Sequence, residues 1–122
     1  MWTVKGSMPT NPKKLLIDAI EAGEAINRHC SSKTRDVYLA DEVLRGFVER
    51  KLLIIGEALA RLRQEHPAKA ERITDVNRII GQRNRIVHGY DAVDDFLIWD
   101  AVRNHLPVLL SQMESLLKEE ID

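Results

Sequence analysis

Apolar residues recur at steps of three and four along almost the whole chain after residue 11, and this spacing constrains the fold more than any other feature. Such a period places the apolar side chains on one face of an α-helix. No stretch shows the alternation of apolar and polar residues that is typical of a half-buried β-strand. The sequence therefore predicts an all-α protein.

The first two periodic segments predict one helix of ordinary length and one long helix. Asn11 followed by Pro12 fits an N-cap and a first helical residue, and the period then continues to about Arg28. The second segment starts between residues 36 and 41 and continues to about Glu65, where the pair His-Pro stops it. We expect the polar, short-chained residues from Cys30 to Lys33, between the two helices, to form a loop.

Two further segments complete the predicted fold. The third helix takes Thr74 or Asp75 as its cap and ends where Gly89 suits a left-handed C-terminal cap. The fourth starts near Val93 and bends at Pro107, because proline has no N–H to donate. Four helices joined by short loops predict an antiparallel up-and-down four-helix bundle with one long second helix.

The composition is that of a single domain. The chain has 122 residues, of which 44% are hydrophobic, and the Gly-Ser pair before Met8 resembles an expression scar. We therefore expect residues 1–9 to be a tag or a disordered N-terminus and residues 10–122 to form the bundle. The single cysteine, Cys30, fits a reducing cytoplasm, and no apolar run approaches the roughly 20 residues that span a bilayer.

The segment RNRIVHGY, residues 83–90, carries the polar chemistry. Residues four apart share a helix face, so Asn84 and His88 are neighbours, and the Arg83 side chain can reach the same place. His88 would lie in the last turn of the helix, where the negative end of the helix dipole favours an imidazolium. A histidine that titrates near neutrality is therefore expected here.

Positive charge gathers around the same segment, although the whole chain has a net charge of -1. Residues 72–90 contain four arginines and one aspartate, a net charge of +3 with histidine neutral. This predicts a local anion site. In a purely structural reading, a helix-terminal histidine is a capping residue and the arginines pair with nearby carboxylates, namely Asp91, Asp94 and Asp95.

The string from Ile79 to Tyr90 resembles the signature of the HEPN superfamily, and specifically of the HepT-like toxins. Their motif is Arg, four residues, His, one residue and Tyr, and Arg83, His88 and Tyr90 fill its three places. Residues 54–58 and 99–107 also resemble the second-helix and last-helix segments of the family. The resemblance covers roughly residues 12–118.

The resemblance implies a toxin that is a metal-independent endoribonuclease, active as a homodimer, which cleaves RNA by attack of its 2′-hydroxyl. In this hypothesis His88 transfers protons and Arg83 binds the phosphate. From its spacing we infer that Asn84 holds the imidazole or contacts the phosphate. Arg78 and Arg85 are the expected substrate-binding residues. Two-fold symmetry would supply a second histidine to the site.

Partners follow from the same resemblance and from the second helix. In HepT-like systems a minimal nucleotidyltransferase antitoxin attaches AMP to the tyrosine that matches Tyr90; the alternative is that this ring only packs at a helix end. Residues 52–54 widen the apolar stripe of the second helix, which predicts a homodimer unless the last helix alone covers them. We expect an RNA substrate and neither a membrane nor DNA as partner.

No cofactor and no metal are expected. The four histidines lack the spacing of metal ligands, and Cys30 has no second cysteine. The alternative function is a non-catalytic helical binding subunit that docks a nucleotidyltransferase and its substrate. A protein of that kind would not need the complete set of Arg83, His88 and Tyr90.

Overall fold

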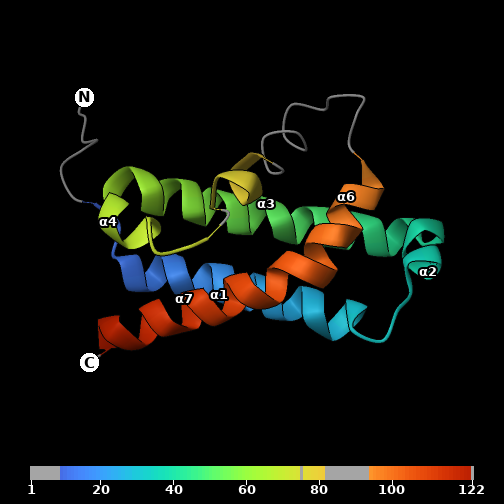
Figure 1. The fold of residues 1–122 in the computed structure, drawn as a ribbon, viewed down its shortest axis with the longest axis horizontal. Coiled ribbons are helices and arrows are strands. Elements are labelled where there is room, and N and C mark those ends of the chain that lie inside the picture. Colours follow the sequence, from blue (N-terminus) through green and yellow to red (C-terminus); the bar gives the residue numbers. More distant parts are fainter. Residues whose placement is uncertain (1–8, 75, 82–93, 122) are drawn as a thin grey trace.

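The structure, a computed structural model, describes residues 9–74, 76–81 and 94–121 and contains helices and no strand within them (Figure 1). The all-α prediction is confirmed, whereas the predicted tag lies, except for its last residue, outside the described ranges. Residues 76–81 are helical. The other helical elements are α1 Pro12–Cys30, α2 Arg35–Ala40, α3 Glu42–Glu65, α4 Pro67–Ala70, α6 Asp95–Asp100, η1 Ala101–His105 and α7 Leu106–Ile121.

α1 begins as the sequence predicts and ends two residues later than expected. The Asn11 side-chain oxygen accepts the Lys13 N–H at 2.9 Å, and Pro12 is the first helical residue, where its missing N–H costs nothing. The helix continues to Cys30, which is completely buried. This burial explains why the chain stays helical through a residue that the sequence pattern assigned to a loop.

The long second helix is confirmed, but a separate short helix precedes it. Asp41 has an extended backbone, and its side-chain oxygen accepts the Leu44 N–H at 3.0 Å, so it caps α3. The preceding helix, α2, has its own cap in Thr34, whose hydroxyl accepts the Val37 N–H at 3.2 Å. The chain therefore changes direction at Asp41, within the range where the periodic pattern begins.

α3 ends at Glu65 beside the start of α1, so the two helices run antiparallel (Figure 1). The Thr10 N–H donates to the Glu65 carboxylate at 2.6 Å, and the Thr10 carbonyl lies 2.8 Å from His66 Nε2. The predicted stop at His66 and Pro67 is confirmed, and α4 follows it as a single short turn. These bonds join elements 55 and 56 residues apart in the chain.

The last helix is interrupted by a π-helical turn rather than by a simple proline bend. In η1 the Leu106 N–H donates to the Ala101 carbonyl, five residues back. Pro107 follows directly, and because it has no N–H it leaves the Arg103 carbonyl without the usual helical donor. The chain stays helical across this point and continues as α7.

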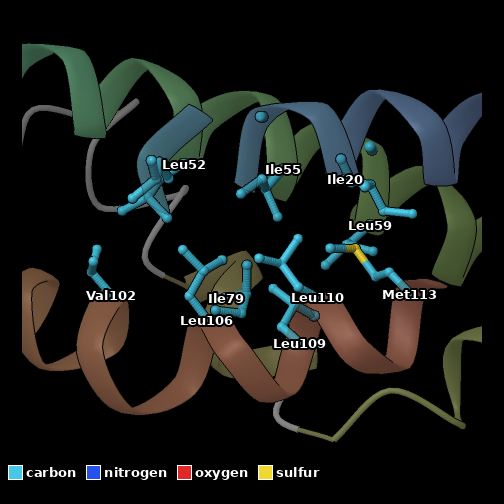
Figure 2. Close-up of a cluster of buried hydrophobic side chains, with 14 of the residues drawn as sticks. Ile20, Leu52, Ile55, Leu59, Ile79, Val102, Leu106, Leu109, Leu110 and Met113 are labelled. Carbon is cyan, nitrogen blue, oxygen red and sulfur yellow. The ribbon is translucent and has the colours of Figure 1, made fainter. Parts of the chain in front are cut away.

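The core lies between α1, α3 and the last helix, and residues 76–81 add Ile79 and Ile80 to it. Figure 2 shows side chains from these elements pointing toward one another, including Leu59 of α3 and Met113 of α7. The predicted helical bundle is confirmed. Among the described helices, none has an apolar stretch long enough to cross a bilayer.

Gly23 lets α1 approach α7 closely. A Cβ atom at this position would lie 2.8 Å from Leu110 Cδ2 and 3.3 Å from Leu106 Cδ1, and both leucines are buried. Gly46, on the exposed side of α3, has nothing within 4 Å of the same atom. Gly23 and Gly46 thus differ in packing and not in helix propensity.

We predict opposite effects for alanine at these two glycines. Gly46→Ala should raise the free energy of unfolding by about 1 kcal/mol, because alanine is the better helix former. Gly23→Ala should lower it by about 1 kcal/mol, since the cost of overpacking exceeds that gain. Urea unfolding followed by circular dichroism measures both. Equal stabilisation by the two substitutions would contradict the close α1–α7 contact.

Candidate functional site

The structure describes one of the residues that the sequence places in the site. Arg78 lies on the helical residues 76–81. The other predicted site residues lie outside the described ranges and stay predictions, namely Arg83, Asn84, Arg85, His88 and Tyr90. The site is therefore built from Arg78 and from the side chains that surround it.

Arg78 contacts His105, the last residue of η1. A guanidinium nitrogen of Arg78 lies 2.9 Å from His105 Nε2. Because an arginine only donates, this hydrogen bond requires Nε2 to accept and the ring proton to sit on Nδ1. The bond therefore joins the predicted substrate-binding arginine to a neutral imidazole.

Asp100 competes for the same ring nitrogen. Its Oδ2 lies 3.4 Å from His105 Nε2, and this nitrogen can donate to the carboxylate only when it carries a proton. Its Oδ1 accepts the Asn104 side-chain N–H at 2.6 Å, which fixes the carboxylate. His105 Nε2 thus lies within reach of both the Arg78 guanidinium and the Asp100 carboxylate.

The π-helical turn makes this cluster possible. Asp100 and His105 are five residues apart, a spacing that places side chains on different faces of an α-helix but on one face of a π-helix. The sequence pattern does not reveal this role of His105, which enters the sequence-based hypotheses only as a possible metal ligand. Pro107 was the available signal, because proline disrupts the helical hydrogen bonds of the preceding turn.

The positive charge predicted for residues 72–90 is partly neutralised. Arg72 forms a two-pronged hydrogen-bonded pair with Glu119 near the end of α7. Arg78 has no carboxylate within 4.0 Å among the residues that the structure describes. The structure describes two arginines of this segment, Arg72 and Arg78. Of these, Arg78 is the one whose charge remains available to an anion.

Two of the three acids that the structural reading assigned to the motif have other partners. Asp94 caps α6, and its Oδ1 accepts the Phe96 and Leu97 N–H groups at 2.9 and 3.3 Å. Asp95 Oδ2 lies 3.7 Å from the Arg45 guanidinium. Asp91 lies outside the described ranges. The local structure therefore already uses Asp94 and Asp95.

Asp95 belongs to a half-buried polar cluster that joins α6 to α2 and α3. Burial is the main cause that raises the pKa of Glu49. The Asp95 carboxylate raises it further, whereas Arg45 lowers it. Burial and Asp95 also raise the pKa of the Tyr38 hydroxyl. Neither this hydroxyl nor Asp95 Oδ1 has a hydrogen-bond partner within the described structure. Two neighbouring carboxylates thus share one guanidinium.

We predict that Glu49→Gln stabilises the protein at pH 7. A carboxyl group whose pKa is higher in the folded state makes stability fall as the pH rises through the two pKa values. The amide removes that loss, so the free energy of unfolding should increase at neutral pH and change little at about pH 3, below the usual carboxyl pKa. Urea midpoints at both pH values test this. The exposed Glu24→Gln is the control, and a stabilisation that persists at the lower pH would contradict the electrostatic cause.

No group of three or more histidine, cysteine, aspartate or glutamate side chains suited to a metal ion occurs in the part of the chain that the structure describes. The expected absence of a cofactor stays a prediction. The cluster of Arg78, His105 and Asp100 offers a cation, a proton acceptor and a carboxylate. These groups suit anion binding and proton transfer.

Comparisons with known proteins identify a family. The sequence model of the family described as Ribonuclease HepT-like matches residues 19–116. The chain is 29% identical over 115 residues to a protein of Thermococcus cleftensis named "Probable ribonuclease HepT", covering 91% of this chain and 100% of that one. It is 27% identical over 109 residues to a protein of Caldanaerobacter subterraneus subsp. tengcongensis named "Putative RNase", covering 89% and 96%. No solved structure matches significantly.

Proposed function

Because the chain belongs to the family Ribonuclease HepT-like, we propose that it is a toxin that cleaves RNA through Arg83 and His88. The observation that carries the proposal is a family match over residues 19–116 that includes a complete Arg, His and Tyr motif. The charge of Arg78, next to the motif in sequence, supports an anionic substrate.

The proposed reaction needs no metal. The 2′-hydroxyl oxygen of the RNA attacks the adjacent phosphorus and loses its proton to a base, while the bond to the 5′-oxygen breaks and that oxygen gains a proton from an acid. His88 of each protomer serves in one of these roles. Arg83 stabilises the negative charge of the transition state, with Asn84 beside it. The products are a 2′,3′-cyclic phosphate and a 5′-hydroxyl.

A homodimer would supply the second histidine, and α3 offers a surface for it. Leu52 is buried, but its neighbours Leu53 and Ile54 are only partly covered by the described chain. A partly covered apolar surface beside a packed core supports a second copy as its cover. The last helix therefore does not completely cover the apolar stripe of α3.

We predict that His88→Ala and Arg83→Ala each lower RNA cleavage by roughly 100-fold or more. Cleavage of a labelled single-stranded RNA by the purified protein, with EDTA present, is the measurement. Arg28→Ala, which removes an exposed arginine of α1, should leave the rate unchanged. Light scattering and thermal unfolding show whether each variant keeps its mass and fold.

Undiminished cleavage by both motif variants would refute the catalytic assignment. Absence of cleavage by the wild type, together with tight binding to a nucleotidyltransferase, would favour the non-catalytic binding subunit. A rate that depends on added magnesium would contradict the metal-independent reaction.

Tyr90 is the proposed site of neutralisation by the antitoxin. Its hydroxyl oxygen would attack the α-phosphorus of ATP, release pyrophosphate and lose its proton, which leaves AMP attached to the ring. The added negative charge lies two residues from His88 and close to the arginines that would bind RNA. The modified toxin should therefore exclude its substrate.

We predict that a minimal nucleotidyltransferase antitoxin with ATP adds the mass of AMP to the wild type and nothing to Tyr90→Phe. The chain has two tyrosines, and the second, Tyr38, is completely buried, so the substitution leaves no exposed tyrosine hydroxyl to modify. Intact-protein mass spectrometry is the measurement. Modification of Tyr90→Phe would place the acceptor elsewhere.

A further inference from the structure

An open cavity of about 580 Å³ lies where α2 meets α6 and η1. Its lining combines two aromatic rings with side chains of both charges. The rings are those of Phe96 and Trp99, and the charged side chains include Arg35, Arg103, Asp36 and Asp100. The proposed catalytic residues lie outside the described ranges, and none of the roles assigned above uses the aromatic rings of this cavity.

Each aromatic ring of the cavity carries an arginine. The Arg35 guanidinium carbon lies 5.5 Å from the centre of the Phe96 ring, and that of Arg103 lies 5.6 Å from the centre of the Trp99 ring. Trp99 is buried and stacks on Tyr38 at 5.0 Å, so its position is fixed by the core. Phe96, by contrast, exposes 56% of its surface. The cavity therefore has a rigid wall and one ring that is open to a planar ligand.

We propose that this cavity binds a nucleobase of single-stranded RNA, stacked on Phe96. The proposal rests on the proposed ribonuclease function and adds a subsite for the substrate. Exposed aromatic rings flanked by arginines are the surfaces on which unpaired bases stack, because both the ring and the guanidinium are flat. A base bound here would cover the exposed ring and retain the neighbouring arginine for the backbone.

The charges of the lining favour a base over a bare phosphate. Among the lining residues that the structure describes, two aspartates offset the two arginines, so these side chains together do not favour a bare anion. A carboxylate instead accepts hydrogen bonds from an amino group of a base. The Asp36 side chain is 89% exposed, and its contact with Arg35 involves only Oδ1 at 3.8 Å, so Oδ2 can accept such a bond, while Asp100 is held by Asn104. Cytosine carries such an amino group and uracil does not.

The lining of the cavity contacts the residues that surround Arg78, the predicted substrate-binding arginine. Asp100, in its lining, lies 3.4 Å from His105, whose ring accepts a hydrogen bond from Arg78. Phe96 follows His88 by eight residues, which sets an upper limit of about 29 Å on the distance between their Cα atoms. One RNA strand can therefore reach both, with its scissile phosphate at the motif and a flanking base on Phe96.

Binding can be tested without cleavage. The probe is a fluorescein-labelled cytidine oligomer of about eight nucleotides whose sugars are 2′-O-methylated, which removes the attacking hydroxyl, and its dissociation constant is measured by anisotropy. Phe96→Ala should weaken binding by about tenfold, and Phe96→Trp should preserve it. Leu97→Ala is the matched control, because it removes the adjacent exposed apolar side chain of α6 and should change nothing. A uridine oligomer should bind the wild type more weakly, and Asp36→Asn should reduce this difference.

Several results would overturn the subsite. Unchanged affinity of Phe96→Ala would exclude stacking, and equal affinity for cytidine and uridine oligomers would exclude recognition by the aspartate. Cytidine monophosphate binding as tightly as the oligomer would assign the cavity to a free nucleotide. A lower mass of both Phe96→Ala and Leu97→Ala in light scattering would instead assign this surface to contact between two copies of the chain. Since His88→Ala should lower the cleavage rate but still bind the oligomer, loss of cleavage and loss of the subsite are separate results.

Discussion

The packing of α1 against both α3 and the last helix is the contact on which the rest of the fold depends. α1 contributes small residues to this contact, including Ala19, Ala22 and Gly23, all buried. Small side chains bring helix axes close together, so the larger side chains of α3 and α7 can meet around α1. Because cores pack at crystal-like density, an added methyl group at Gly23 must displace a leucine of the last helix.

The sequence predicted the elements of this bundle better than their boundaries. The helical period and the cap at Asn11 are set by residues a few positions apart in the chain, and both predictions were confirmed. The break at Asp41 was not foreseen as a break, because a residue with an extended backbone still leaves the apolar period nearly in step on either side. The π-helical turn before Pro107 was not predicted for a similar reason. A single turn of wider period interrupts the apolar pattern too briefly to be seen in the sequence.

The site shows a similar division. The motif from Arg83 to Tyr90 could be found from sequence because its chemistry lies within eight residues. The contact between Arg78 and His105 could not, since it joins residues 27 apart through a turn of non-standard period. Phe96 stands at helical spacing from the apolar residues of the last helix, a pattern that predicts burial, yet it is exposed. A period reports which residues share a face; it does not report what covers that face.

The partners of the arginines separate structural charges from functional ones. A bidentate carboxylate satisfies both the charge and the planar geometry of a guanidinium, as Glu119 does for Arg72, and leaves little attraction for a further anion. A neutral imidazole accepts a hydrogen bond from one N–H group of Arg78, but it does not neutralise the positive charge of the guanidinium. The same residue that fixes the arginine in place therefore leaves its positive charge free for a phosphate.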